Sequence, residues 1–456
     1  MSNHLNILIS GSGIAGSVFA FWLLRAYPNA SITIVERDPS LRLTGASVDI
    51  RSSAVDIIKW MGVEEEIRRK TTKEEGMQFV DINGKEIATF RATGRTDIQS
   101  FTSEFEIFRG ELAQILIAPV LDRVKVIFGE TVEDFEEVDD GINVTFAKNK
   151  EVTKYDLLVA ADGLGSRIRG KILNTKPSEQ IHDEGVHIAY FTVNSDLLKG
   201  ELLAKGVSVK GGRAVIIRPD PHPEGKTRAM FMNVTWKSNV EMKKRLNIAL
   251  REGNEAYMKL MEELYADVGW LTPEILRGMR QSDDFYWFVN SSLQCLSDLG
   301  SESGFLSILI SNYTKLKVIT KHLTSSLFAQ IRSPKLHQGR VVLLGDAGYA
   351  TPGFGTSLAI IGSYVLAGEL LSKGGDVQKA LEGYSGLMKP FVKASQGDDI
   401  AMQLCNPQTE WGIWTRNSIL KTATLLRLDR IAISAAAWLG FTEKKAPLPN
   451  YPWPSK

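Results

Sequence analysis

The feature that most constrains the fold is a glycine-rich turn near the start of the chain. Residues 5–9 are an apolar run typical of a buried strand, and residues 14–25 have helical spacing. A second apolar run at residues 31–35 completes a strand–helix–strand unit, which predicts the beginning of a parallel sheet with a right-handed crossover. The turn between the first strand and the helix contains Gly11, Gly13 and Gly16.

Each of these glycines has its own physical role in a nucleotide-binding turn. Gly11 permits the tight turn, Gly13 lets a pyrophosphate approach the backbone, and Gly16 lets the helix pack closely on the strand. The N-terminus of the helix supplies N–H donors and partial positive charge to the phosphates. Glu36 follows the second strand and could accept hydrogen bonds from adenosine ribose hydroxyls. This context favours a dinucleotide-binding turn over a glycine-rich turn in an unrelated α/β protein. It does not distinguish NAD from FAD as the dinucleotide.

Two later segments also end a buried strand with small residues and a carboxylate. The first reaches Asp162-Gly163 after the apolar run at residues 155–160. The second runs through Gly345-Asp346 and continues to Pro352-Gly-Phe-Gly355. With these three motifs in order, the chain resembles the flavoprotein hydroxylases of the p-hydroxybenzoate hydroxylase type. Within that family it looks most similar to compact enzymes such as the tetracycline-degrading monooxygenases. The resemblance extends from the first strand to about residue 370.

The resemblance implies a set of cofactor-binding residues. Asp346 would hydrogen-bond the ribityl chain, and the turn from Pro352 to Gly355 would bring N–H donors to the pyrimidine edge of the flavin. Asp162 matches a motif associated with both FAD and the nicotinamide cofactor. Arg109 matches a family arginine that contacts the phosphate or ribityl region of the flavin cofactor. Arg37 and Asp49 match the family pattern less sharply.

Two positions depart from the family pattern. Tyr349 stands where the family commonly has a histidine, and Ser357 stands where it has an asparagine. Neither change removes a backbone donor, so we expect FAD binding to be retained. The tryptophan motif of flavin halogenases is absent, and the pair Trp411 and Trp414 is expected to pack the C-terminal helix rather than to form a substrate platform.

Composition narrows the class of protein further. The 456 residues carry a formal net charge of +1 without a basic stripe, which favours neither a nucleic-acid nor an anionic-membrane partner. Cys295 and Cys405 have no metal-ligand spacing, so no metal site is expected, and they suit a reducing compartment. No signal peptide is expected at the N-terminus, and four charges interrupt the apolar region at residues 419–441, which favours docked helices over a membrane anchor. We expect a cytoplasmic protein without stable membrane insertion.

These patterns predict an α/β protein with a Rossmann-like FAD-binding domain, an inserted antiparallel β substrate domain and C-terminal helices. The FAD-binding domain is expected to be discontinuous, and an Asn83-Gly84 hairpin with a type I′ turn is expected in the substrate domain. The expected FAD-binding segments are 1–75, 105–175 and 336–395; the substrate segments are 76–104 and 176–335; the helical segment is 396–456.

One stretch of the expected substrate domain has no family counterpart. Residues 288–325 add about 40 residues without a clean period, which exceeds ordinary connection lengths. Two explanations remain open, a surface insertion or an intron retained in the translated sequence.

The resemblance also implies the activity. It points to non-covalent FAD, a transient NAD(P)H co-substrate, and transfer of oxygen from O₂ to a small aromatic or polycyclic molecule by hydroxylation or epoxidation. The flavin carries the chemistry in such enzymes, so no catalytic residue is assigned. The isolated His187 and His222 are expected to be structural. A flavin oxidase or dehydrogenase on the same scaffold, and a non-catalytic redox-sensing flavoprotein, remain alternatives.

Overall fold

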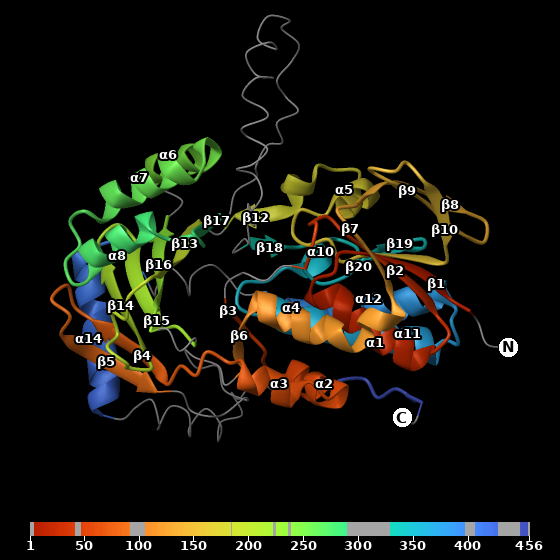
Figure 1. Ribbon diagram of the computed structural model, residues 1–456, viewed down its shortest axis with the longest axis horizontal. Helices are drawn as coiled ribbons and strands as arrows, with labels where there is room; N and C mark the ends of the chain where they lie inside the picture. The colour runs from red at the N-terminus through yellow and green to blue at the C-terminus, as the bar shows by residue number, and fades with distance from the viewer. Residues whose placement is uncertain are drawn as a thin grey trace, which may run out of the picture.

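The computed structural model describes residues 4–41, 47–91, 105–183, 185–221, 225–235, 239–289, 329–396, 406–426 and 447–454. These residues form two lobes that lie side by side (Figure 1). One lobe contains a mostly parallel sheet between helices, and the other contains an antiparallel sheet with helices along it. The predicted fold class is confirmed.

The first lobe is centred on a six-stranded sheet in the order β19-β20-β11-β1-β2-β7. Parallel pairing joins β1 to both β2 and β11, and only β19 runs antiparallel to its neighbour in this sheet. The strands have near-continuous apolar character because both faces are covered, as parallel sheets require. Their bounds are β1 (Asn6–Ser10), β2 (Ser31–Glu36), β7 (Lys125–Phe128), β11 (Leu157–Ala160), β19 (His337–Gln338) and β20 (Val341–Leu343).

Helices from widely separated parts of the chain enclose this sheet. The largest helix pair is α1 against α11, whose apolar residues share one core cluster with the strands. The helices are α1 (Ile14–Ala26), α2 (Ser53–Met61), α3 (Glu64–Arg69), α4 (Arg109–Ile117), α5 (Arg167–Leu173), α10 (Asp346–Tyr349), α11 (Gly355–Ser372) and α12 (Val377–Ser395). Short 3₁₀ helices follow at Ala118–Arg123 and Pro177–Gln180. Helix α11 is long and apolar enough to span a membrane, but 78% of it is buried inside the protein, so it is a core helix.

Small sheets flank the first lobe. An antiparallel meander lies beside the main sheet, and two two-stranded ribbons lie toward the second lobe. The meander consists of β8 (Val132–Val138), β9 (Gly141–Phe146) and β10 (Val152–Tyr155). The ribbons pair β3 (Ser47–Asp49) with β6 (Glu106–Phe108), and β12 (Ile181–Asp183) with β18 (Ala329–Ile331).

The second lobe is a seven-stranded sheet in the order β17-β13-β16-β15-β14-β4-β5. Its neighbours are antiparallel except β14 and β4. The strands are β4 (Gly76–Val80), β5 (Glu86–Arg91), β13 (Val186–Val193), β14 (Leu203–Val209), β15 (Arg213–Pro219), β16 (Thr227–Val234) and β17 (Tyr286–Val289).

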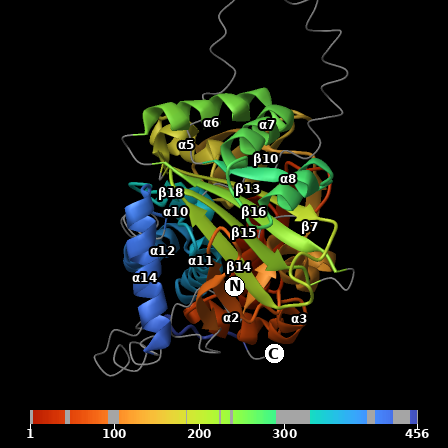
Figure 2. The same ribbon diagram turned by 90° about the vertical axis from the view of Figure 1, so that its left-hand side faces the viewer.

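The two faces of this sheet have different partners because side chains alternate along each strand. One face packs Phe191 and Phe231 against α6 (Val240–Glu252), α7 (Asn254–Tyr265) and α8 (Thr272–Arg280). The opposite face presents a smaller apolar set that includes Ile188, Met230 and Met232. Figure 2 shows α8 beside β13 and α14 (Glu410–Leu425) along the other side of the sheet, where it contacts β5.

Two local expectations need correction. In the hairpin, Gly84 has φ +80° and no other residue of the turn has positive φ, so the turn is not type I′. The side chain of Asp81 accepts hydrogen bonds from the N–H groups of Asn83 and Lys85, which holds a different turn. Trp411 and Trp414 do not pack α14, because they are 74% and 65% exposed.

The remaining difference concerns a boundary. Phe288 and Val289 belong to β17, which pairs with β13, so these two residues are part of the sheet rather than of an added segment. Residues 290–325 of the expected insertion lie outside the described residues, as do Cys295, Cys405, His222 and residues 427–441.

The last described segment returns to the first lobe. Tyr451 is buried against Gly368 of α11, and its hydroxyl donates to a carboxylate oxygen of Glu369 at 2.9 Å. Trp453 lies 4.6 Å from Trp22 of α1 between ring centroids. The core of the first lobe therefore contains residues from both ends of the described chain.

Candidate functional site

The glycine-rich turn has the geometry that its sequence predicts. Gly11 has φ +110°, and a Cβ atom there would overlap the carbonyl oxygen of Ala161. A Cβ atom on Gly16 would overlap the carbonyl oxygen of Gly11, which explains the close approach of helix and strand. Gly13 differs, because a Cβ atom there would meet no described atom within 4 Å. Space is therefore open next to Gly13, where the N-terminus of α1 points.

Glu36 connects the end of β2 to this turn. Its Oε2 accepts hydrogen bonds from the backbone N–H of Ser12 at 3.0 Å and from the Ser12 hydroxyl at 2.8 Å. Its Oε1 accepts from the backbone N–H of Asp38 at 3.0 Å. The sequence predicts Glu36 as a ribose ligand; in the structure its carboxylate fixes the glycine-rich turn. Arg37, the next residue, is exposed.

The Asp162-Gly163 motif packs directly against the glycine-rich turn. A Cβ atom on Gly11 would lie 3.2 Å from the backbone nitrogen of Asp162. Burial raises the pKa of Asp162, even though Ser166 donates a hydrogen bond that favours its ionised form. Its Oδ1 is buried without a hydrogen-bond donor among the described residues. A buried acceptor without a donor is costly, so this atom suits a ligand that donates a hydrogen bond.

Arg169 joins the second motif to the third. The guanidinium is buried and donates to the carbonyl oxygens of Ala347 at 2.9 Å and of Leu164, in the turn after Asp162, at 2.6 Å. Burial lowers the pKa of Arg169 to about 10, although the charge of Asp162 opposes that change. This arginine holds the turn after Asp162 against the turn that contains Asp346.

The third motif brings Asp346 to Arg109. Nη2 of Arg109 lies 3.5 Å from Oδ2 of Asp346, and both side chains are partly exposed. A Cβ atom on Gly355 would lie 3.1 Å from Oδ1 of Asp346, so the carboxylate lies against the first residue of α11. The turn before that helix is closed by the N–H of Gly355, which donates to the carbonyl of Thr351 at 2.8 Å. Pro352 lies within this turn.

The two departures from the family pattern have structural explanations. The Ser357 hydroxyl accepts a hydrogen bond from the backbone N–H of Arg51 at 2.9 Å, which ties α11 to the segment after β3. Tyr349 is buried, and its hydroxyl meets that of Tyr384 at 3.0 Å. A Cβ atom on Gly362 would overlap that same Tyr349 hydroxyl, so the ring is part of the packing between α10 and α11.

Asp49 belongs to a second group of charges beyond the flavin motifs. Its Oδ2 accepts from Nη2 of Arg51 at 2.8 Å, and in the β3–β6 ribbon it lies opposite Glu106. Burial raises the pKa of Asp49, and the charge of Glu106 raises it further. The structure therefore places Asp49 among charged side chains that the sequence analysis did not identify.

The residues present fit a flavin dinucleotide. Open space lies next to Gly13, and a Cβ atom on Gly163, Gly165 or Gly353 would likewise meet no described atom within 4 Å. The glycine-rich turn touches the Asp162 turn, and a Cβ atom on Gly345 would lie 2.8 Å from the Cβ of Ala15 at the start of α1. All three motifs therefore meet at the carboxyl edge of one parallel sheet, where α/β folds bind nucleotides.

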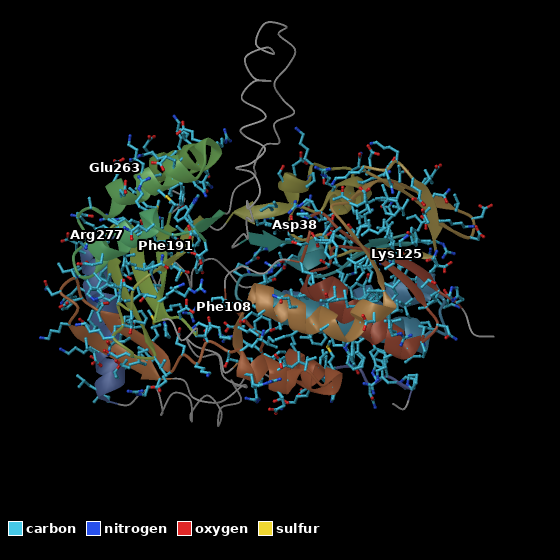
Figure 3. All side chains as sticks on the ribbon, in the orientation of Figure 1. Asp38, Phe108, Lys125, Phe191, Glu263 and Arg277 are labelled. Carbon is cyan, nitrogen blue, oxygen red and sulfur yellow. The ribbon has the colours of Figure 1, made fainter. Side chains whose placement is uncertain are left out.

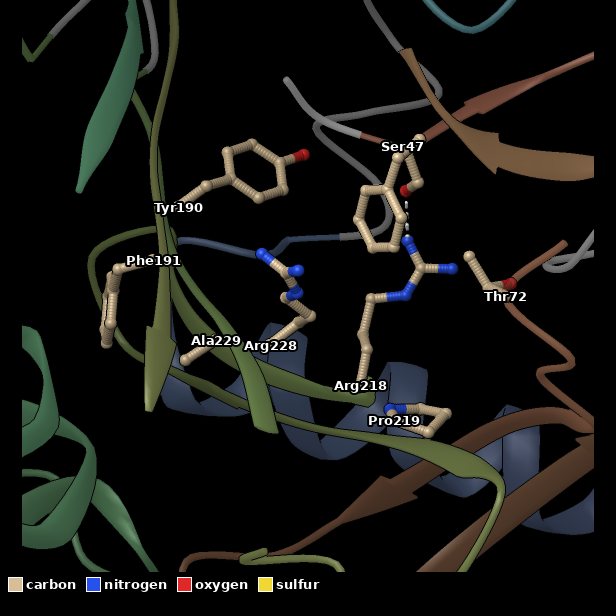
Figure 4. Close-up of a pocket in the computed structure, with 9 residues that line it drawn as sticks. Ser47, Thr72, Tyr190, Phe191, Arg218, Pro219, Arg228 and Ala229 are labelled. Carbon is tan, nitrogen blue, oxygen red and sulfur yellow. Dashed lines mark hydrogen bonds between the residues drawn. The ribbon is translucent and has the colours of Figure 1, made fainter. Parts of the chain in front are cut away.

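A pocket opens between the β3–β6 ribbon of the first lobe and the antiparallel sheet of the second lobe (Figure 4). Phe108, which precedes Arg109, lines it from the first lobe and lies between the lobes (Figure 3). Tyr190, Arg218 and Arg228 line it from the antiparallel sheet. Ser47 and Thr72 complete the polar part of the wall.

Arg218 is held in this pocket by three partners. Its Nη1 donates to the Ser47 hydroxyl at 2.8 Å, and two carboxylates, Glu74 and Glu106, bind the other nitrogens. Burial raises the pKa of Glu74 to about 7, even though the neighbouring Arg218 charge opposes the rise. Burial also raises the pKa of Tyr190 to about 12. The only sequence signal for this group is a single arginine within an otherwise apolar strand, as at Arg218 in β15.

Comparison with known proteins places the chain in a family. Residues 4–253 match the FAD binding domain family. The FAD-dependent monooxygenase asL4 of Sarocladium schorii is 31% identical, with 98% of each chain covered. The crystal structure of tetracycline destructase Tet(51) superimposes with a TM-score of 0.67 at 25% identity, covering 99% of this chain and 100% of that one. Klebsiella pneumoniae HpxO complexed with FAD and uric acid shares the fold, with a TM-score of 0.66 at 18% identity over 94% of this chain and 95% of that one. This chain belongs to the family of FAD-dependent monooxygenases.

Proposed function

We propose that this monooxygenase holds FAD non-covalently along the carboxyl edge of the six-stranded sheet. Gly11, Gly13 and Gly16 would receive the pyrophosphate at the N-terminus of α1. Glu36 would receive the adenosine ribose, to which it can offer the one lone pair on Oε1 that its bonds to Ser12 and Asp38 do not use.

The isoalloxazine end would lie between Arg109, Asp346 and the first turn of α11. Asp346 would accept hydrogen bonds from the ribityl hydroxyls, and the N–H of Gly353, within the turn from Pro352 to Gly355, would offer a donor to the pyrimidine edge. The helix N-terminus favours negative charge there, which stabilises a reduced flavin. Asp162 has a buried oxygen that can accept a hydrogen bond from the same cofactor.

We further propose that NADH or NADPH is the reductant and that an aromatic or polycyclic molecule is the oxygen acceptor. When bound, FAD would supply the redox and oxygen chemistry, and the protein would orient the acceptor and exclude water. One observation carries this proposal: Phe108 lines the pocket, and the adjacent Arg109 contacts Asp346. The pocket is therefore one residue away from the proposed flavin contacts.

The test uses the purified, FAD-loaded protein. Polycyclic phenols are screened for those that accelerate NADH or NADPH oxidation, and turnover is then run under ¹⁸O₂. We expect one labelled oxygen atom per product molecule. Unlabelled product with stoichiometric hydrogen peroxide would identify an oxidase and refute the monooxygenase proposal for that substrate.

A further inference from the structure

Two arginines lie directly opposite each other on the pocket face of the antiparallel sheet. Arg218 of β15 and Arg228 of β16 are register partners. Figure 4 shows both guanidinium groups pointing into the pocket on the side of Tyr190 and Ser47. Like charges in directly opposed positions destabilise a sheet, so this pair needs compensation.

Two buried carboxylates compensate Arg218. Its Nε lies 2.7 Å from Oε2 of Glu74, and its Nη2 lies 2.5 Å from Oε2 of Glu106. The Glu74 and Glu106 side chains are 3% and 7% exposed, so water screens these contacts little. Burial alone would lower the pKa of Arg218, but the charges of Glu106 and Glu74 keep it well above its ordinary value.

Two further carboxylates compensate Arg228. Its Nε lies 3.0 Å from Oδ2 of Asp220, and its Nη1 lies 2.8 Å from Oδ2 of Asp284. Asp284 is fixed in turn by the N–H of Thr192 at 2.8 Å and by the Thr192 hydroxyl at 2.6 Å. Burial would raise the pKa of Asp284, but the hydrogen bonds from Thr192 and Ser282, together with the Arg228 charge, hold it below its ordinary value.

The wall consequently contains cationic donors without a net positive charge. Four carboxylates contact the two guanidinium groups, so attraction of an anionic ligand to either arginine is opposed by repulsion from the carboxylates behind it. The N–H groups of the two arginines can nevertheless donate hydrogen bonds to a ligand. A guanidinium has five N–H groups, and the bonds of Arg218 to described residues use three of them. The aromatic rings of Phe108 and Tyr190 belong to the apolar part of the same wall.

We infer that this pocket selects uncharged polyphenolic or quinone-like aromatic substrates and discriminates against aryl carboxylates. Their hydroxyl and carbonyl oxygens would accept hydrogen bonds from Arg218 and Arg228, and their rings would lie against Phe108 and Tyr190. A carboxylate would instead meet two guanidinium groups whose positive charge is already offset by the carboxylates behind them. This inference rests on the proposed function, because it takes the pocket as the site of the oxygen acceptor.

A matched pair of ligands tests the inference. 1,8-Dihydroxyanthraquinone is uncharged at neutral pH, and 4,5-dihydroxyanthraquinone-2-carboxylic acid differs from it by one carboxylate. Both are titrated into the oxidised, FAD-loaded enzyme without reductant, and binding is followed by the change in flavin fluorescence and absorbance. We expect the uncharged compound to bind at least about 10-fold more tightly. Equal or tighter binding of the acid, or no binding of either compound, would overturn the inference.

Variants identify the cause of the preference. Asp284→Asn and Glu106→Gln each remove one negative charge and keep the shape of the side chain, so each should lower the preference several-fold and the double variant should reverse it. Glu262→Gln is the matched control, because Glu262 shares Arg280 with Glu255 on the helices of the other face. A preference that survives in the double variant, or that falls equally in Glu262→Gln, would refute the role of these carboxylates.

If one single variant does not retain flavin, the other still tests the same point, because the two carboxylates hold different arginines. Binding is measured without turnover, so its outcome is separate from that of the oxygen-transfer experiment. An enzyme that prefers the uncharged ligand but forms only peroxide would refute the proposed reaction and leave the selectivity established.

Discussion

Arg109 and Asp346 are 237 positions apart in the sequence, yet their side chains lie 3.5 Å from each other at the edge of the parallel sheet. Replacing Asp346 with alanine would remove the proposed acceptor for the ribityl hydroxyls and leave Arg109 without this partner. Loss of a partner for such groups costs about 1–3 kcal/mol, which corresponds to a roughly 5- to 150-fold weaker affinity for FAD.

Glu36→Gln is the comparison variant for that prediction. It retains one oxygen that can accept from Ser12, and water can replace part of its contact with the ribose, so the loss of affinity should be smaller. Titration of FAD into both apo-variants measures the difference. Equal losses, or a larger loss in Glu36→Gln, would contradict the assignment of Asp346 to the ribityl chain.

Gly11 and Gly13 are only two residues apart but should respond differently to alanine. Gly11→Ala places a Cβ atom on the Ala161 carbonyl in a left-handed backbone conformation, so it should lower the free energy of unfolding by at least about 2 kcal/mol. Gly13→Ala meets open space and should leave the apo-protein as stable as the wild type while weakening FAD binding. Thermal unfolding with and without FAD distinguishes the two effects. Equal destabilisation of the apo-protein by both changes would contradict the finding that open space lies next to Gly13.

Glu74 should make stability depend on pH. Its folded pKa is about 7 against an ordinary value of 4.5, so the folded state binds more protons than the unfolded state between these values. Stability should therefore fall as pH rises from 4.5 to 7, by at most about 3 kcal/mol for this group. Glu74→Gln should lose that part of the slope. The measurement is the unfolding midpoint from pH 5 to pH 8 for both proteins, and parallel curves would show that Glu74 has an ordinary pKa.

Tyr451, in the last described segment, and Trp411, in α14, should affect stability differently when replaced with alanine. Tyr451 is 7% exposed and packed on α11, so Tyr451→Ala should cost about 3 kcal/mol of stability. Trp411 is 74% exposed, and Trp411→Ala should change stability by less than about 0.5 kcal/mol. Chemical denaturation of the two variants checks this, and a large loss in Trp411→Ala would restore the packing role that its sequence suggested.

The FAD-binding part of the molecule could be predicted from the sequence because its constraints are local. The glycines at 11, 13 and 16 each need a particular backbone or a particular clearance, and the sheet, the helix and the turn follow from them. The predicted strand at residues 31–35 and the helix at 14–25 match β2 and α1 to within one residue.

The charge cluster of the pocket could not be predicted because it is assembled across the fold. Glu74 precedes β4, Glu106 lies in β6 and Arg218 lies in β15, so no spacing in the sequence connects them. Trp411 and Trp414 led to a wrong expectation for the opposite reason. Their hydrophobicity suggests burial, but only tertiary contacts decide which side of α14 faces the sheet.

The return of residue 451 to the first lobe has a consequence for synthesis in the cell. Leu5 and Tyr451 belong to the same core cluster, so that cluster is incomplete until residue 451 has left the ribosome. At ordinary translation rates, roughly 20 to 90 s separate the synthesis of Leu5 from that of Tyr451. The antiparallel sheet is complete once residue 289 has been synthesised, because β17 then pairs with β13. The lobe that begins the chain is therefore the later one to finish folding, and nascent intermediates will expose the apolar sides of α1 to chaperones during that interval.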